Sequence, residues 1–212
     1  MNQQTISQME SLHPPASDPV PPLPNNAPTF HNIDLDILAK VVRESLANGS
    51  SPAGSGWTGD LIKGLIGDKE CLAGLGAIVR DILSGSLPES CRPLLVSSVL
   101  IAVDKDSGGK RPIAMGECFY KLACLYGLSF VRADIASILE PMQLALSPGG
   151  SESVVHMLQA ALDLHPEWVV VYISNAFNTG RGTILSSLFQ ETKLAPLWRL
   201  AFGPTDLIHH FL

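Results

Sequence analysis

The sequence has few charged residues, and basic residues are the scarcer kind. Of its 212 residues 16% are charged, with 14 Lys and Arg against 20 Asp and Glu, which gives a net charge of −6. Non-specific affinity for nucleic acids comes largely from Lys and Arg side chains that neutralise phosphates. The composition therefore excludes a general phosphate-binding surface and leaves room only for a local basic groove.

Cysteine is also scarce, and its spacing does not match a metal site. The four cysteines, Cys71, Cys91, Cys118 and Cys124, show no C-x-x-C spacing and have no paired histidines nearby. We therefore predict buried, reduced thiols, which are typical of a reducing compartment. We find no apolar run of membrane-spanning length, and the N-terminus lacks the basic-then-apolar layout of a signal peptide. These absences predict an intracellular protein, cytoplasmic or nuclear, that has no membrane partner.

Residues 1–31 contain no Lys or Arg and are rich in Pro, Ser, Asn and Gln. Such a segment buries too little apolar surface to offset the entropy cost of ordering it, so we predict a disordered, Pro-rich lead. Its run Pro21–Pro24 could serve as a polyproline ligand, but a solvated tail is the preferred interpretation. With 212 residues, 46% of them hydrophobic, the chain is long enough for one globular domain and part of a second.

The rest of the chain reads as mostly helical, with a few strands. Asp34 precedes an amphipathic pattern as an N-cap, Gly85 is a plausible C-cap, and Ser151 or its neighbour is a candidate N-cap. A buried strand is predicted from Trp168, because apolar residues run there into a tight turn. Apolar periodicity predicts helices over residues 35–48, 59–66, 70–84, 117–139, 151–164 and 183–189.

Residues 99–115 predict a β-hairpin with a basic tip. Two apolar strands flank the Gly108-Gly109 turn, which presents Lys105, Lys110 and Arg111. One interpretation is a phosphate-binding tip, and the other is a solvated turn whose charges only keep the hairpin soluble.

Several segments resemble, in the same order, motifs of reverse transcriptases from non-LTR (LINE-like) retrotransposons. The Arg-Pro-Ile-Ala-Met-Gly-Glu run from Arg111 is followed by aromatic residues and Lys-Leu, as in that family. Three further segments resemble other motifs of that family. They are the Gly/Ser loop, the segment with the Gly149-Gly150 turn, and the predicted Trp-Val-Val strand that ends in Asn-Ala-Phe-Asn. The four segments span residues 49–58, 111–122, 143–152 and 168–178.

The resemblance implies an α+β fold, an incomplete right-hand polymerase fingers–palm domain that is mostly helical, with a fingers β-hairpin and a palm strand. The fingers would span about residues 32–165 and the start of the palm about residues 166–212.

The resemblance also implies functional roles for individual residues. Lys105 and Arg111 would hold nucleotide phosphates, and Asn175 and Phe177 would lie at the nucleotide, although core packing explains Phe177 equally well. The backbone at Gly149 and Gly150 would face the template strand.

One departure from the family pattern concerns catalysis. The metal-binding aspartate of the first palm motif should stand three residues before Asn175, but Tyr172 occupies that position. The segment is also two residues shorter than the family pattern, as a two-residue deletion or an incorrect gene model would produce. Polymerases use carboxylates to hold two Mg²⁺ ions, and a phenol is a poor Mg²⁺ ligand at neutral pH. We find no Y/F-A-D-D motif with the further metal ligands, so we expect neither a bound cofactor nor polymerase activity.

Three functional hypotheses follow. The first is a degenerate or truncated reverse transcriptase-like protein from a retrotransposon, inactive as an RNA-directed DNA polymerase. The second is a non-catalytic module that binds an RNA or DNA template-primer, a nucleotide or an intact reverse transcriptase. The third is a fragment of a longer active reverse transcriptase.

Overall fold

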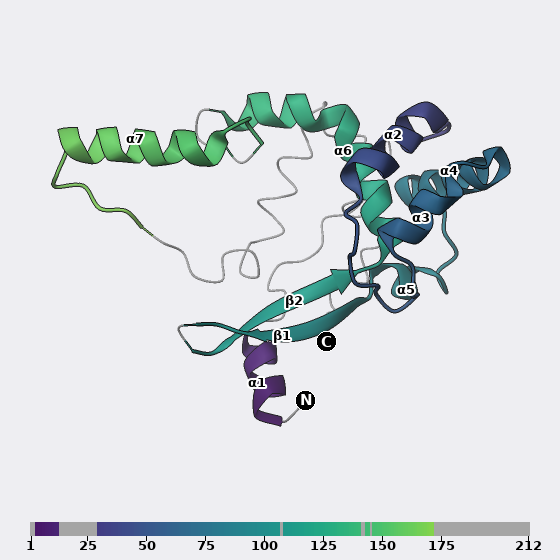
Figure 1. Cartoon of the computed structure of the whole chain (residues 1–212), viewed down its shortest axis with the longest axis horizontal. Helices are drawn as coiled ribbons and strands as arrows, with labels where there is room; N and C mark the ends of the chain where they lie inside the picture. The colour runs from purple at the N-terminus through teal and green to yellow at the C-terminus, as the bar shows by residue number, and fades with distance from the viewer. Residues whose placement is uncertain (1–2, 13–28, 107, 141–142, 145, 172–212) are drawn as a thin grey trace.

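The structure is a computed structural model, and it describes residues 3–12, 29–106, 108–140, 143–144 and 146–171. Helices at one end of the molecule pack around a shared core, while a β-hairpin and a long helix extend from them to one side (Figure 1). The described elements are α1 (Gln3–Ser11), α2 (Leu35–Ser45), α3 (Gly59–Leu65), α4 (Lys69–Ser84), α5 (Arg92–Val96), β1 (Ser98–Asp104), β2 (Lys110–Gly116), α6 (Cys118–Leu139) and α7 (Gly150–Leu164).

The core lies between α2, α4 and the first half of α6, and we call these helices together with α3 the helical cluster. Its side chains are almost fully removed from water, and burial of apolar surface at roughly 25 cal/mol per Å² is the main stabilising contribution. Gly76 allows close packing of α4 against α2, because a Cβ there would lie 2.7 Å from Leu35 Cδ2. The most buried large side chains are Tyr126, Leu38, Ile62, Leu83, Leu122, Val42 and Val79.

Capping residues define where the helices of the cluster begin and end. The Asp34 carboxylate accepts hydrogen bonds from the backbone N–H groups of Asp36 and Ile37, each at 3.0 Å. The backbone N–H of Asp34 donates to the Tyr126 hydroxyl at 2.9 Å, which links the start of α2 to α6. Gly85 ends α4 in the left-handed conformation with φ 66°. The predicted N-cap at Asp34 and C-cap at Gly85 are confirmed.

The predicted hairpin is confirmed as a two-stranded antiparallel sheet of β1 and β2. Its register pairs Ser98 with Gly116 at the base and Asp104 with Lys110 at the tip. Directly opposed residues share a face, so Val99, Ile101 and Val103 lie on one side together with Ile113. These four side chains remain 38 to 40% exposed.

Two helices were not predicted from the sequence. Helix α1 forms within the segment expected to be disordered, so that expectation is wrong for residues 3–11. The helix contacts β2 and buries Met9, which is 3% exposed, and this tertiary contact offsets the ordering cost that composition alone suggested. Helix α5 is a single short turn with proline in its first positions, too short for a periodic pattern to reveal.

The region from α7 onward differs from the prediction. We call residues 150–171 the α7 arm. Helix α7 begins after Gly149, with φ 65°, and has no side-chain cap, so the expected Ser151 cap is wrong. Residues 168–171 form no strand, and Val169 is 83% exposed. The predicted buried strand is therefore wrong for these four residues, because no neighbouring strand pairs with them within the described residues.

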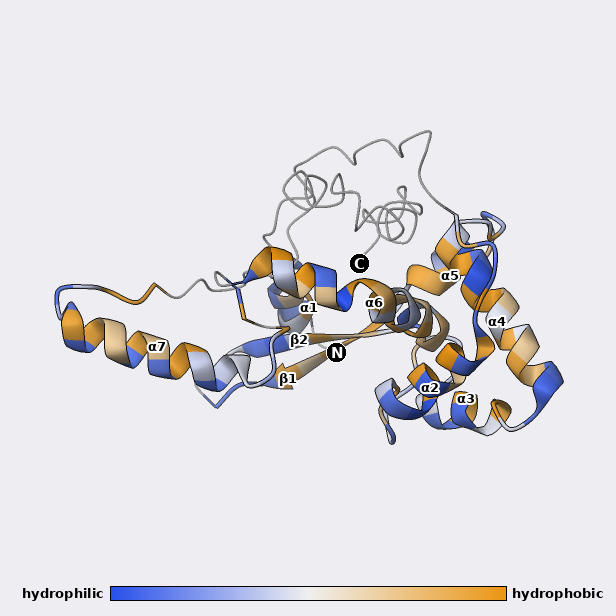
Figure 2. Ribbon diagram, turned by 90° about the horizontal axis from the view of Figure 1, so that it is seen from above, coloured by the Kyte–Doolittle hydropathy of each residue, from blue (hydrophilic) through white to orange (hydrophobic). Residues whose placement is uncertain are grey.

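Figure 2 shows that the hydrophobic residues of α7 extend along a helix that projects away from the helical cluster. Among the described residues of α7, only Gly150 is buried. Val155 is 64% exposed and Met157 is 56% exposed.

Helix α6 corrects the expectation that no apolar stretch could span a membrane. With 22 residues, it is the one helix in the described part of the chain that is long and apolar enough by length and composition. A core helix of a soluble protein passes the same test, and α6 packs its Leu122 and Ala123 into the helical cluster with no exposure.

The described structure agrees with the predicted α+β class: it is mostly helical with a small antiparallel sheet. The prediction that residues 183–189 form a helix lies outside the described residues.

Candidate functional site: the basic hairpin tip

Two backbone hydrogen bonds join the described residues of the turn between β1 and β2. The Lys105 N–H donates to the Gly109 carbonyl at 3.2 Å, and the Gly108 N–H donates to the Lys105 carbonyl at 2.9 Å. Gly108 and Gly109 both have positive φ, 83° and 86°, a conformation that residues with a Cβ rarely adopt. The glycine pair therefore determines where the neighbouring cations project.

The three cations at the tip are not equivalent. Lys110 forms an ion pair with the carboxylate of its cross-strand partner Asp104. Lys105 and Arg111 are exposed, and neither forms an ion pair with another described residue. Asp106 lies next to Lys105 in sequence and lowers the local positive charge. The structure thus leaves Lys105 and Arg111, the two residues that the sequence singled out, available for an external anion.

Strand register separates these two kinds of cation. Arg111 lies opposite Val103, on the face that carries Ile101, whereas Lys110 and Asp104 lie on the other face. An anion bound by Arg111 would therefore contact a partly apolar surface, which lowers the local dielectric and strengthens a bidentate guanidinium contact.

The Gly149-Gly150 turn is shaped by a close backbone approach. A Cβ at Gly150 would lie 1.9 Å from the Leu144 carbonyl oxygen, so glycine is required there. The Gly150 N–H already donates to the Ser147 carbonyl at 3.0 Å, and Glu152 adds a negative charge in the first turn of α7. The Gly150 N–H is therefore not free to donate to a phosphate, and the nearby Glu152 charge would repel one. The template-side role of the turn stays a prediction.

Tyr172, Asn175 and Phe177 lie outside the described residues. Before them, Trp168 stacks on His165 with ring centroids 4.4 Å apart and 9° between the ring planes.

Acidic and other metal-ligating side chains are dispersed. No group of three or more His, Cys, Asp or Glu within the described ranges could hold a metal ion. Asp163 accepts a hydrogen bond from Gln159 at 2.9 Å on the exposed surface of α7. His156 is exposed, and its Nε2 lies 3.8 Å from the Glu152 carboxylate.

The four cysteines are free, as predicted, but the prediction that all four are buried is wrong for two of them. Cys118 is buried and Cys124 is partly buried, whereas Cys71 and Cys91 are exposed. Burial raises the pKa of the Cys124 thiol to about 11, so this thiol is a poor nucleophile at neutral pH. A hydrogen bond with the Asp68 carboxylate is the largest cause of a raised pKa at Cys71.

One connection that sequence reasoning missed joins two of the motifs. Glu117 occupies the N-cap position of α6 and is 4% exposed. Its carboxylate accepts a hydrogen bond from the Ser55 N–H at 2.9 Å and another from the Ser55 hydroxyl. The Gly/Ser loop is thereby attached to the residue that follows β2. In the sequence, this connection was indicated only by the position of Glu117, a single carboxylate between a predicted strand and an apolar helix.

In a comparison with known proteins, the chain is similar to a retrotransposon-encoded protein. The chain is 25% identical over 183 residues, 86% of its length, to the retrotransposable element SLACS 132 kDa protein of Trypanosoma brucei gambiense. It spans 15% of the length of that relative. No protein-family model matches the chain, and no solved structure matches it. The similarity supports a retrotransposon-derived origin for this protein.

Proposed function

We propose that the protein is a reverse transcriptase-like product of a retrotransposon that has no polymerase activity of its own and retains an anion-binding hairpin tip. The observation that carries this proposal is the shared order of the four motif segments between residues 49 and 178. The 183-residue similarity to a retrotransposable element protein agrees with it.

The proposed loss of activity rests on the chemistry of phosphoryl transfer. The reaction needs carboxylates that hold two divalent cations, which activate the attacking hydroxyl and stabilise the leaving group. Tyr172 stands where the first of these carboxylates is expected. Without bound metal, the developing charge loses several kcal/mol of transition-state stabilisation.

Primer extension tests this part of the proposal. Purified wild-type chain and a Tyr172→Asp variant, both checked for folding by circular dichroism, are assayed with Mg²⁺ on an RNA template. We expect no incorporation by either, because one restored carboxylate does not complete a two-metal site. Incorporation by the wild-type chain would overturn the proposal.

The proposed retained function is the binding of phosphate groups on a template-primer or nucleotide at the hairpin tip. Lys105 and Arg111 supply charge-assisted donors, and the ion pair with Asp104 withdraws Lys110 from that role. The protein is therefore expected to bind weakly and with a small salt dependence, since few phosphates are neutralised.

Fluorescence anisotropy with a labelled RNA–DNA duplex measures this binding. We expect the Lys105→Ala and Arg111→Ala variants each to weaken binding by roughly threefold to tenfold, the loss of one charge-assisted contact. Asp104→Asn should strengthen binding, because it releases Lys110. Lys69→Ala, which removes an exposed cation from the start of α4, is the matched control. If Lys69→Ala weakens binding as much as Lys105→Ala and Arg111→Ala do, net charge and not the hairpin tip governs binding.

A further inference from the structure

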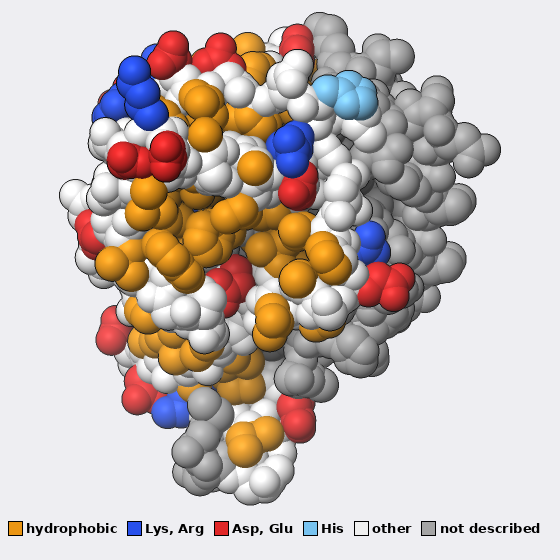
Figure 3. Space-filling model, turned by 90° about the vertical axis from the view of Figure 1, so that its right-hand side faces the viewer, with side chains coloured by type: hydrophobic (Ala, Val, Ile, Leu, Met, Phe, Trp, Pro, Cys, Tyr) orange, Lys and Arg blue, Asp and Glu red, His pale blue; other side chains and the backbone are white. Residues whose placement is uncertain are grey.

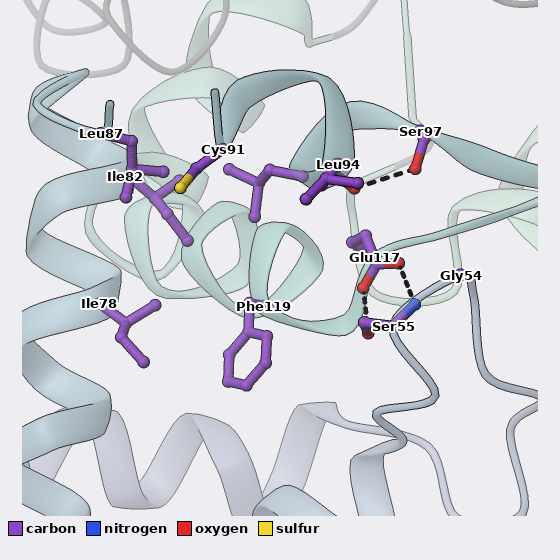
Figure 4. A pocket seen from close by; sticks show the side chains of 11 residues that line it. Gly54, Ser55, Ile78, Ile82, Leu87, Cys91, Leu94, Ser97, Glu117 and Phe119 are labelled. Atoms are coloured by element: carbon purple, nitrogen blue, oxygen red, sulfur yellow. Dashed lines mark hydrogen bonds between the residues drawn. The ribbon is translucent and has the colours of Figure 1, made fainter. Parts of the chain in front are cut away.

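The helical cluster contains a groove that no motif accounts for. It has a volume of about 340 Å³ and lies where α4, α5 and the start of α6 meet the Gly/Ser loop. Ile78 and Ile82 of α4, Leu94 of α5 and Phe119 of α6 form most of its apolar wall (Figure 4). This volume is in the range of sites that hold small organic molecules.

Figure 3 shows the side of the molecule on which α4 and α5 lie. Hydrophobic side chains gather over the middle of this face, and charged side chains are scattered around them. Leu94 is 71% exposed and Ile78 is 40% exposed, so the apolar surface is accessible from solvent.

The groove also contains a buried charge. The Glu117 carboxylate lines it, is 4% exposed, and receives its two hydrogen bonds from Ser55 (Figure 4). A carboxylate can accept about four hydrogen bonds, so about half of its accepting capacity remains. Among the described residues no Lys, Arg or His forms an ion pair with it. A buried carboxylate without a cation favours an incoming positive group.

We propose that this groove binds a small organic amine with an apolar body, whose ammonium group pairs with Glu117 and whose apolar part packs against Ile78, Leu94 and Phe119. An anion of the same shape is repelled by Glu117. A neutral molecule gains only the apolar contacts. The preference for a cation therefore distinguishes this site from an apolar surface that binds hydrophobic compounds non-specifically.

The chain carries its own reporter for this site. Cys91 lines the groove, and its sulfur projects toward the side chain of Ile82 (Figure 4). Cys71 is also exposed but is not among the groove residues. A ligand in the groove should protect the first thiol from alkylation and leave the second unchanged.

The experiment measures alkylation of the full chain by N-ethylmaleimide, site by site, with mass spectrometry. The probe is phenylbutylamine, compared with phenylbutyrate and phenylbutanol, which have similar apolar bodies. At a probe concentration about ten times its dissociation constant, Cys91 should react about tenfold more slowly while the rate at Cys71 is unchanged. The carboxylate probe should give no protection, and the alcohol should require a higher concentration than the amine.

Two variants test the two halves of the site. Glu117→Gln should weaken protection by the amine by about tenfold and leave the alcohol nearly unaffected. Leu94→Gln alters an exposed wall residue that the fold tolerates, and it should weaken protection by both compounds. Leu61→Gln, on the exposed surface of α3 outside the groove, is the control and should change neither. Equal protection by amine and carboxylate, or protection of neither thiol by the amine, would overturn the proposal.

Discussion

The helical cluster and the α7 arm have similarly apolar sequences, but their side chains meet different surroundings. In the cluster, Leu38 and Leu122 are fully buried, whereas in the arm Val155 and Val169 are 64% and 83% exposed. The difference lies in packing partners: α4 packs against α2 and α6, whereas α7 makes no comparable contact with another described helix or strand. Apolar periodicity thus predicts where helices form, but the available partner surfaces decide which helices contribute to stability.

The largest effect expected from this comparison is in the core. Leu122→Ala should lower the free energy of unfolding by about 2–5 kcal/mol, through lost burial and the cavity left behind. The matched Val155→Ala substitution on the α7 arm should change it by less than about 0.5 kcal/mol. Urea unfolding followed by circular dichroism measures both. Equal losses would mean that the arm is packed in solution.

The next effect concerns the turn that starts the arm. Gly150→Ala places a methyl group against the Leu144 carbonyl, and overpacking of this kind costs about 1–3 kcal/mol. Because α7 has few packing partners among the described residues, we expect Gly150→Ala to speed amide exchange within residues 150–164. The unfolding midpoint of the helical cluster should stay unchanged. Gly74→Ala, at a helical position with no atom within 4 Å of the added Cβ, should instead stabilise α4 by up to about 1 kcal/mol.

A smaller effect tests the hydrogen bond between α2 and α6. Tyr126→Phe removes the hydroxyl that accepts from the Asp34 N–H and should cost about 1 kcal/mol. Ser137→Ala, which removes an exposed hydroxyl from the same helix, serves as the control. If both variants unfold at the same urea concentration as the wild type, the contact contributes nothing to the stability of the cluster.

The smallest expected effect comes from the Cys124 thiol, whose titration changes the free energy of unfolding only at alkaline pH. The pKa of Cys124 is raised by burial from its ordinary 9.0 to about 11. Between these values the unfolded chain loses the thiol proton and the folded chain keeps it, so the free energy of unfolding falls as pH rises. Below pH 9.0 this contribution is constant. Cys124→Ala should make the decline shallower, and an identical pH profile for both proteins would contradict the assignment.

Much of the described fold was predictable from local patterns. The N-cap at Asp34, the C-cap at Gly85 and the Gly108-Gly109 turn act over a few residues, so the sequence alone revealed them. Helix α1 and the exposed residues 168–171 were mispredicted because each depends on distant surfaces: α1 has β2 beside it, and the strand-like run has no partner among the described residues.

The same division applies to the candidate sites. The sequence identified the hairpin cations, but the strand register decided that Lys110 is paired with Asp104 while Arg111 is left exposed. It gave no indication of the groove, because Ser55, Ile78, Leu94 and Glu117 come from four separated segments.

By itself, the sequence determined the hairpin turn, most of the helices of the helical cluster and two of their caps. These properties arise from near neighbours along the chain. Only the tertiary structure decided which apolar faces are buried, which cations are neutralised, and where a carboxylate is enclosed with its hydrogen bonds to Ser55. Burial and charge pairing depend on residues far apart in sequence. Their contacts contribute to stability only after folding has brought those residues together.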